Sequence, residues 1–322
     1  MISAKAPGKA VIWGEYAVLA GAPAMVMAVD RYAECQIEPG GEVWSCQALG
    51  FNDQVEVSAD QLLSASVPMH GAAAPIAVAS QTLGLTSIPA GARVQLDSRA
   101  FFAESHPDRK LGIGSSAAIC TAACAAMAEL SGNSLSFEQA LHAHRQMQQA
   151  QGSGIDVAAA YYGGVLRFSE GKATPTQWPQ ALCYRFIWTG VSAKTTSHLQ
   201  TFSQWRSAGD TRALDNLANA CAALFVQADI DSLRDYVEQL KKLDQAAGLG
   251  IYSEPHKQLD RLAIEHQLVY KPCGAGGGDI GIVFGNVEQH QNHLDLFTQT
   301  ARRQAFHPLA LEIAAHGIRP TR

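Results

Sequence analysis

The chain has 322 residues, with 24 Lys and Arg against 29 Asp and Glu and a formal net charge of −5. Hydrophobic residues make up 47% of the sequence, which indicates a folded chain with a sizeable core rather than extensive disorder. The acidic balance disfavours a general nucleic-acid binder, and no apolar run reaches the roughly 18 residues of a membrane-spanning helix. Because the N-terminus also lacks a signal-peptide core, we expect a soluble, cytoplasmic protein without nucleic-acid or membrane partners.

In the first half of the chain, residues 2–38 alternate short apolar runs with Gly and Pro, which predicts strands joined by tight turns. Residues 60–83 look helical and residues 93–97 look like a strand. The Ala-rich stretch 115–130 ends at a Ser-Gly pair, so it predicts a helix with a glycine stop. Residues 163–168 read as a further strand.

The second half begins after a polar, proline-containing segment at 171–179, the best candidate for a domain boundary. Apolar residues recur at three- and four-residue steps within 231–248, which predicts an amphipathic helix. The other expected elements are a strand at 183–189, a helix at 255–267, a glycine-rich loop at 274–278 and a strand at 280–284. Strands and helices mix without regular alternation, so we expect an α+β fold in two lobes.

Seven cysteines are widely spaced without any Cys-x-x-Cys, so neither a disulfide framework nor a structural zinc is expected. Cys120 and Cys124 are interpreted as small core residues. Histidines without metal-like neighbours in the sequence are expected to have surface or packing roles: His70, His142, His144 and His198.

The most informative segment is 110–118, Lys-Leu-Gly-Ile-Gly-Ser-Ser-Ala-Ala. Gly112 and Gly114 allow the backbone to approach a ligand, and a helix that starts after them offers unpaired N–H groups to a phosphate. Ser115 or Ser116 would also suit Mg²⁺ as an oxygen ligand. The alternative is an ordinary turn in which Ser116 caps the helix.

Two further segments are glycine-rich. In 7–18, Lys9 follows Gly8 where a strand is expected to begin, so its ammonium group would point into a cleft or simply be solvated. In 271–279, four glycines in five positions indicate a backbone that passes close to a ligand or another loop. The sequence has no P-loop, and its one dinucleotide-like glycine pattern precedes a strand instead of a helix.

In order and spacing, the three segments resemble the motifs of the GHMP kinase superfamily, which includes galactokinase, homoserine kinase, mevalonate kinase and phosphomevalonate kinase. The resemblance implies a GHMP kinase fold with two lobes and ATP phosphates bound on the second motif. The first lobe, 1–175, would resemble domain 2 of ribosomal protein S5. The second, 176–322, would be a ferredoxin-like α/β lobe.

Within the superfamily the sequence is most similar to phosphomevalonate kinases. Tyr16 stands where mevalonate kinases usually have His, and Asp279 ends the third motif where they tend to have Gly. The segments 29–31, 152–158 and 188–198 are also similar to that family. The implied activity is ATP-dependent phosphorylation of 5-phosphomevalonate to 5-diphosphomevalonate by a monomer or homodimer.

The resemblance also implies roles for individual residues. Lys9 would contact the transferring or accepting phosphate, and Asp156 would lie beside the acceptor. The nucleotide would be held by Gly112, Gly114, Ser115, Ser116 and Ala117, with Ser116 also on Mg²⁺. The substrate would be lined by Lys9, Lys110, Ser153, Ser192, Lys194, Ser197 and Gly276.

Three questions stay open at this point. Asp156 follows Gly-Ser-Gly-Ile and precedes an Ala-rich stretch, so it is either a helix cap or a catalytic group, as base or as organiser of Lys9. Mevalonate kinases carry a metal-binding glutamate before this segment, but residues 143–151 contain His144 and Arg145 and no carboxylate. The alternative functions are a kinase for mevalonate or another small alcohol, and a non-catalytic metabolite-binding regulator.

Overall fold

The computed structural model describes residues 1–322 apart from 52, 65–70, 149–151, 194, 210 and 321–322. In the described residues the chain forms two lobes, one built on an eight-stranded sheet and the other on a four-stranded sheet. A two-stranded hairpin, β6 (Phe102–Ala103) with β7 (His106–Lys110), stands apart from both sheets. The two-lobed α+β fold expected from the sequence is confirmed.

The first lobe is organised around a long antiparallel pair, β1 (Ile2–Trp13) and β2 (Ala24–Pro39), with a 3₁₀ turn between them. The main path of the sheet runs β14-β1-β2-β5-β3-β4, and β8 and β9 extend it from the other end of β2. The remaining strands are β3 (Trp44–Leu49), β4 (Asp53–Val57), β5 (Ala92–Asp97), β8 (Val165–Ser169), β9 (Lys172–Thr176) and β14 (Arg319–Pro320).

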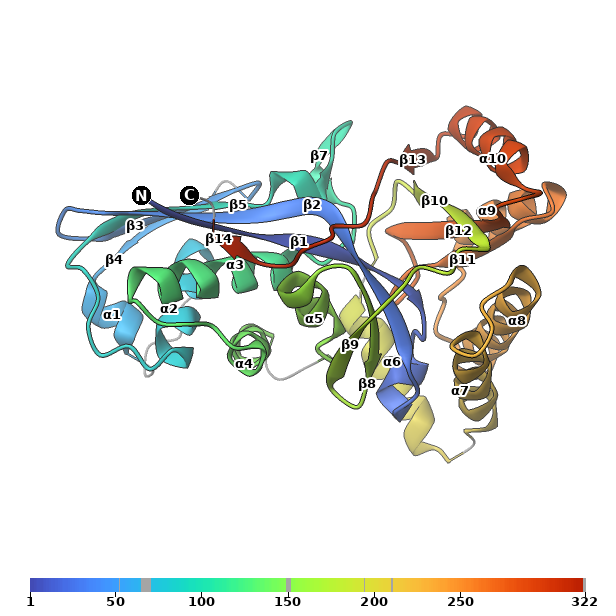
Figure 1. Ribbon diagram of the computed structural model, residues 1–322, viewed down its shortest axis with the longest axis horizontal. Coiled ribbons are helices and arrows are strands. Elements are labelled where there is room, and N and C mark those ends of the chain that lie inside the picture. The colour runs from blue at the N-terminus through green and yellow to red at the C-terminus, as the bar shows by residue number, and fades with distance from the viewer. Residues whose placement is uncertain (52, 65–70, 149–151, 194, 210, 321–322) are drawn as a thin grey trace.

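Helices cover one face of this sheet (Figure 1). The central helix, α3 (Ser115–Leu130), contacts β1 and β2 through a buried face of Ala and Cys, because such small side chains let a helix lie close to a sheet. Its bounds match the predicted helix. The other helices of the lobe are α1 (Ala59–Leu63), α2 (Ala74–Thr82), α4 (Phe137–Met147) and α5 (Ile155–Tyr162).

The second lobe has the strand order β11-β12-β10-β13. Its helix α8 (Ile230–Ala247) buries Leu233, Val237, Leu240 and Leu243, so the predicted apolar face is confirmed. The strands are β10 (Leu182–Trp188), β11 (Val269–Pro272), β12 (Ile280–Asn286) and β13 (His307–Leu309). The other helices are α6 (Thr195–Ser207), α7 (Arg212–Leu224), α9 (Glu254–Glu265) and α10 (Gln291–Arg303).

The structure differs from the sequence predictions in two places. The single helix predicted over 60–83 is wrong, because α1 ends at Leu63, Ser64 has an extended backbone and α2 begins only at Ala74. Strands β3 and β4 were not predicted, since both are short and contain several polar residues.

The chain passes between the two lobes twice, once after β9 and once before β14. Strand β9 lies inside the predicted boundary 171–179 yet pairs with β8, so the first sheet continues to Thr176. The end of the chain then returns to the first lobe, where Ile313 bridges Val29 and β14 pairs with β1. The predicted second unit, 176–322, therefore contributes β14 to the sheet of the first.

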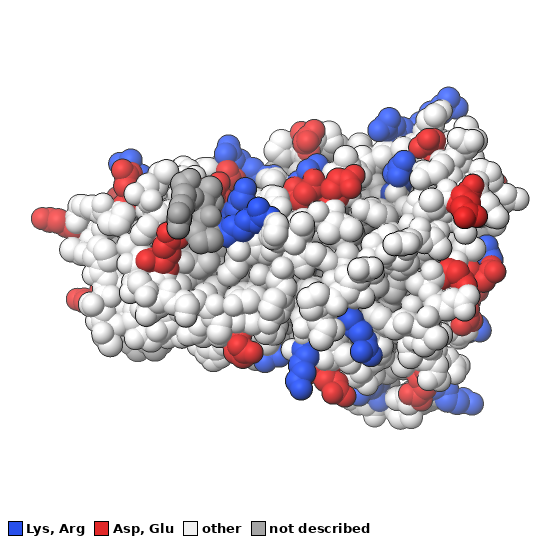
Figure 2. Space-filling view, in the orientation of Figure 1, with Lys and Arg blue, Asp and Glu red and all other residues white. Residues whose placement is uncertain are grey.

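Surface charge is mixed on the face drawn in Figure 2, where Lys and Arg are scattered among Asp and Glu over both lobes. Within the ranges that the structure describes, none of the helices is long and apolar enough to span a bilayer.

Candidate active site

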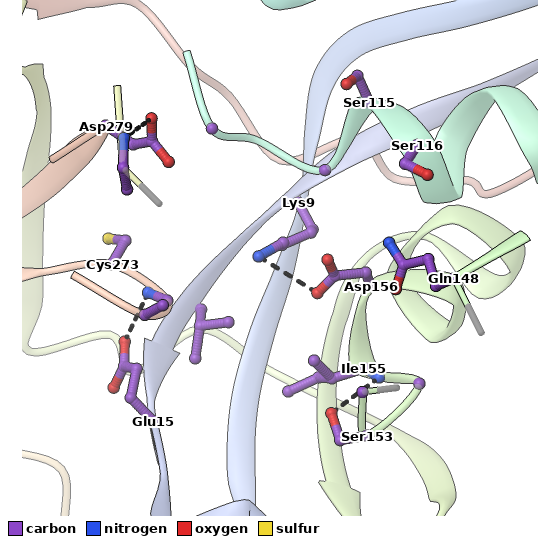
Figure 3. Close-up of a pocket in the computed structure, with 18 of the residues that line it drawn as sticks. Lys9, Glu15, Ser115, Ser116, Gln148, Ser153, Ile155, Asp156, Cys273 and Asp279 are labelled. Carbon is purple, nitrogen blue, oxygen red and sulfur yellow. Dashed lines mark hydrogen bonds and ion pairs between the residues drawn. The ribbon is translucent and has the colours of Figure 1, made fainter. Parts of the chain in front are cut away.

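A cavity of about 560 Å³ lies where the three glycine-rich segments meet. Its walls come from β1, the loop before α3, helices α4 and α5, and the loop between β11 and β12. Segments far apart in the sequence therefore line one cavity, which Figure 3 shows from inside.

Lys9 stands at the centre of this view, on β1 (Figure 3). It lies within the strand, so the prediction that β1 begins at Lys9 is wrong. The Lys9 N–H donates to the Ile113 carbonyl at 2.8 Å, which ties β1 to the Gly-Ser loop. Gly8 permits this contact, because a Cβ at that position would lie 2.7 Å from the Ile113 oxygen.

The Lys9 ammonium group forms an ion pair with Asp156, with Nζ and Oδ1 3.2 Å apart. Their side chains are 12% and 34% exposed, so the pair borders the cavity rather than the core. Burial alone would lower the pKa of Lys9, but the Asp156 carboxylate outweighs burial and raises that pKa above its usual value. Lys9 is therefore a stable cation at neutral pH.

Asp156 is the second residue of α5, and the cap alternative for it is wrong. Gly154 occupies the N-cap position with a φ of 89°, and Ser153 Oγ accepts from the Ile155 N–H at 3.3 Å. The sequence left the question open, because Gly and Asp both occur at helix N-caps. The Asp156 carboxylate is thus left to face Lys9.

The Gly-Ser loop reaches α3 through two residues in the left-handed region, Gly112 with a φ of 78° and Gly114 with a φ of 84°. Gly114 is the N-cap of α3, so the alternative in which Ser116 caps the helix is wrong. Ser115 and Ser116 both line the cavity. Ala117 is buried in the first turn of the helix.

A second, mostly apolar pocket of about 280 Å³ adjoins this loop. Ser115, Ser116 and Lys110 border both spaces. Lys110 Nζ lies 4.6 Å from the centre of the Phe51 ring, and partial burial lowers the pKa of its ammonium group despite the opposing charge of Asp279.

The third glycine-rich loop is held by side chains from other elements. The Tyr16 hydroxyl donates to the Ala275 carbonyl at 2.7 Å, and His198 Nδ1 lies 3.0 Å from the same oxygen. A Cβ on Gly277 would lie 2.4 Å from the His198 ring. A Cβ on Gly278 would also lie 2.6 Å from the Val191 carbonyl oxygen, so the backbone of this loop passes close to another loop, in agreement with the sequence expectation.

Of the residues predicted to line the substrate, some border the cavity and others do not. Ser153 and Ser192 line the cavity, whereas Gly276 packs against Ile251 outside the set of lining residues. Ser197 belongs to α6, but its side chain is outside the described residues, as is the whole of Lys194.

Asp279 closes this side of the cavity. It has a φ of 59°, and its Oδ1 accepts from the Ala193 N–H at 3.0 Å. Burial raises the pKa of Asp279, although that hydrogen bond and the charges of Lys9 and Lys110 act in the opposite direction. Gly112 lies directly against this side chain, because a Cβ there would be 2.2 Å from the Asp279 carboxyl carbon.

Sequence reasoning missed a buried ion pair between Glu15 and Lys271. The Tyr236 hydroxyl donates to the Glu15 carboxylate at 2.5 Å and accepts from the Gly14 N–H at 2.9 Å. The Gly274 N–H also approaches Glu15, at 3.4 Å. The only sequence signal for this network was two charged residues inside otherwise apolar runs.

The histidine and cysteine expectations have mixed outcomes. The surface or packing role expected for His144 is incomplete, because this buried ring also lines the cavity; His70 lies outside the described residues. The seven cysteines are buried and free, so the core interpretation of Cys120 and Cys124 is confirmed. Burial raises the pKa of the cavity-lining Cys273 thiol to about 12, which keeps it protonated and a poor nucleophile.

Known proteins resemble the chain both in sequence and in fold. Residues 75–164, which include the Gly-Ser loop and Asp156, match the family described as GHMP kinases N terminal domain. The two-lobed fold and relatives that align along most of the chain agree with this match.

Its relatives include both phosphomevalonate kinases and mevalonate kinases. It is 28% identical to "Phosphomevalonate kinase" of Streptomyces sp. (strain CL190) over 97% of each chain. It is also 27% identical to "Mevalonate kinase" of Pyrococcus horikoshii over 86% of each chain. The solved phosphomevalonate kinase of Streptococcus pneumoniae in complex with phosphomevalonate and AMPPNP superposes with a TM-score of 0.76 at 19% identity, covering 97% of this chain and 100% of that one.

Proposed function

We propose that the protein transfers the γ-phosphoryl group of ATP to the phosphate of 5-phosphomevalonate, which gives 5-diphosphomevalonate on the mevalonate route to isoprenoids. The observation that carries this proposal is the Lys9–Asp156 pair, which faces the Gly-Ser loop across one cavity. Similarity to a phosphomevalonate kinase over 97% of both chains supports the choice of acceptor.

The nucleotide would bind with its phosphates at the start of α3. The first-turn N–H groups there have no partner within the helix, and the helix dipole favours an anion. Gly112 and Gly114 would let the backbone approach the phosphates, and Ala117 would present a backbone N–H. The adjoining apolar pocket is placed to receive the nucleotide base.

Magnesium fits the donors at this end of the cavity. Among the described contacts the Ser116 hydroxyl has no hydrogen-bond partner, and it lines the cavity; Mg²⁺ is commonly held by few protein oxygens together with substrate phosphates. Consistent with few protein ligands, the described residues contain no cluster of three His, Cys, Asp or Glu. When bound, the ion would neutralise part of the phosphate charge.

The acceptor would meet Lys9 and Asp156. A phosphomonoester has its second pKa near 6, so at neutral pH it is already a nucleophilic oxyanion and needs no base. The main barrier is then repulsion between two polyanions, which Lys9 would relieve at the point of transfer. In this reaction Asp156 acts as the organiser of Lys9, holding its ammonium group in position.

The remaining predicted residues would surround the acceptor. Lys110 borders both spaces of the site and would approach phosphate oxygens, and Ser153 and Ser192 would offer hydroxyl groups. Gly276 would shape the third loop through its contact with Ile251 instead of touching the substrate. Contacts from Lys194 and Ser197 stay predictions.

A second candidate reaction is phosphorylation of an alcohol such as mevalonate. The observation in its favour is the partly exposed Asp156 carboxylate, which could accept the proton that a hydroxyl must lose. Mevalonate kinases among the relatives agree with this alternative.

Release of ADP from MgATP separates these reactions when 5-phosphomevalonate, mevalonate and a few small alcohols are compared. The proposal predicts turnover with 5-phosphomevalonate and at most trace turnover with the others. Turnover with mevalonate in place of the phosphorylated compound would overturn the choice of acceptor while keeping the kinase. If ATP binds but no acceptor leads to release of ADP, the proposed class of acceptor is wrong.

A further inference from the structure

One face of α4 lines the cavity, although no role has been assigned to it above. Leu141, His144, Arg145 and Gln148 are spaced by three, one and three residues, which places them on a single helical face, and all four border the cavity. Leu141 packs closely against Gly154, where a Cβ would lie 2.6 Å from the Leu141 Cδ1 atom. This contact holds α4 in place. In Figure 3, Gln148 lies beside Asp156 on this wall.

Arg145 is a cation without a fixed partner. In the part of the chain that the structure describes, its exposed side chain forms no hydrogen bond or ion pair. The other lining cations differ, since Lys9 is paired with Asp156 and Lys110 lies over the Phe51 ring. Arg145 is therefore free to bind an anion that enters the cavity.

The carboxylates of the cavity leave room for such an anion. Glu15 is paired with Lys271, and Asp156 is paired with Lys9. Asp279 accepts a backbone hydrogen bond from Ala193. Of the acidic lining groups, only Asp108 on β7 remains without a partner among the described contacts, and it lies on a different wall from α4.

His144 supplies a second, independent observation. Its side chain is 6% exposed and lines the cavity, yet its Nε2 is buried without any hydrogen-bond partner among the described residues. A buried polar atom without a partner is unfavourable, so a ligand atom that completes the bond is expected. Burial lowers the pKa of this imidazole despite the nearby Asp156 charge, so the ring is neutral, and its Nε2–H tautomer donates to an oxygen.

We propose that Arg145 and His144 form a subsite for phosphate oxygens on the α4 wall of the cavity. Arg145 supplies the charge and His144 a hydrogen bond, so cations approach the site from three elements: β1, β7 and α4. The subsite rests on the proposed kinase function, which brings two phosphate-bearing ligands into this cavity. Its phosphate belongs either to the transferred end of the nucleotide or to the acceptor.

Calorimetric titration of the full-length Arg145→Gln variant tests the subsite. The ligands are AMP, ADP, AMPPNP, 5-phosphomevalonate and mevalonate, each compared with wild type. Loss of a charge-assisted contact should weaken binding by about 10- to 100-fold. A loss that appears with ADP or AMPPNP but not AMP assigns the subsite to the nucleotide. A loss confined to 5-phosphomevalonate assigns it to the acceptor.

Three further variants make the result specific. Arg145→Lys should restore part of the affinity, because it keeps the charge and loses the planar fork. His144→Phe should weaken the same ligand as Arg145→Gln by a smaller factor. His142→Ala is the matched control, since His142 lies on the same helix, is exposed and bonds Gln146 away from the cavity. It should bind every ligand as wild type does.

Two results would overturn the subsite. One is wild-type affinity of Arg145→Gln for all five ligands. The other is an equal loss for every ligand, AMP and mevalonate included, together with a lower melting temperature, which would assign Arg145 to the C-terminal dipole of α4. Failure of the kinase proposal is distinguishable, because it removes turnover but leaves the nucleotide titrations informative.

Discussion

Two Lys–carboxylate pairs lie near each other around the active-site cavity, and they differ in how completely they are satisfied. Lys9 and Asp156 are 3.2 Å apart with side chains 12% and 34% exposed. Lys271 and Glu15 have side chains 0% and 2% exposed. The first pair borders the space a ligand would fill, while the second is closed to solvent.

The two pairs also differ in how many further hydrogen bonds their side chains form. Lys271 Nζ also donates to the Val11 carbonyl at 3.3 Å, and Glu15 accepts from Tyr236. Lys9 has three N–H donors and one carboxylate partner among the described contacts, so it keeps donors for a phosphate. The same two residue types therefore act as a ligand-binding pair in one place and as a connection between the lobes in the other.

Removing Lys9 should abolish most catalysis with little effect on the fold. The Lys9→Met variant should lower kcat on the order of a thousandfold, because one charge that stabilises the transferring phosphoryl group is lost. Steady-state ADP release measures this effect. Turnover equal to wild type would contradict the role given to Lys9.

Removing Lys271 should do the opposite. Breaking a buried pair leaves an uncompensated charge, so Lys271→Met should lower the free energy of unfolding by about 3–5 kcal/mol. Denaturant unfolding monitored by circular dichroism measures it. The double variant Glu15→Leu with Lys271→Met should recover most of the loss, since neither charge then remains buried. A stable single variant would show that the pair does not join the lobes.

The buried imidazole of His256 predicts that the stability of the fold depends on pH. His256 lies between Tyr270 and the Gly278 carbonyl, and burial lowers its pKa to about 4. Because this pKa is below the unfolded value near 6.5, the unfolded state binds the proton more tightly, and stability falls as pH drops from about 6.5 to about 4. The expected loss is roughly 3 kcal/mol.

Unfolding free energies between pH 7 and pH 4 test this prediction. His256→Asn should flatten the profile over that interval, whatever its stability at pH 7. A variant profile as steep as that of wild type would assign the dependence to other groups, of which His144 has the same sign.

The smallest effect concerns the third loop. Tyr16→Phe removes the hydroxyl that donates to the Ala275 carbonyl, while His198 stays close to that oxygen. We expect a loss of about 1 kcal/mol in unfolding free energy and a small rise in KM. Thermal unfolding and initial rates measure the two quantities. A loss above about 3 kcal/mol would mean that Tyr16 holds the lobes together as the Glu15 pair does.

How far the sequence predicted the site depended on the separation of the residues involved. The Gly-Ser loop and the start of α3 were predictable, because Gly112, Gly114 and the helix that follows act locally. The proximity of Lys9 and Asp156 follows from strand and helix packing across the fold, and only the family resemblance indicated it. Glu15 and Lys271 carried no local signal, since a buried charge is stable only beside a partner from the other lobe.

The residues of α4 that line the cavity show a different limit of prediction from sequence. His144 and Arg145 were visible in the sequence as residues of a segment without carboxylates. Helix α4 itself was not predicted, because its buried face is made mostly of small side chains among many polar residues. Without the helix, the shared face of these residues toward the cavity could not be inferred.

Phosphorus NMR of the reaction of 5-phosphomevalonate with MgATP tests the central claim most directly. Transfer to the acceptor phosphate would create a new P–O–P linkage, so we predict a second pair of mutually coupled phosphorus signals, distinct from those of ADP, that grows with wild type and does not grow over the same time with Lys9→Met. ATP consumption that yields only inorganic phosphate, or a new monoester signal on an alcohol, would contradict the account.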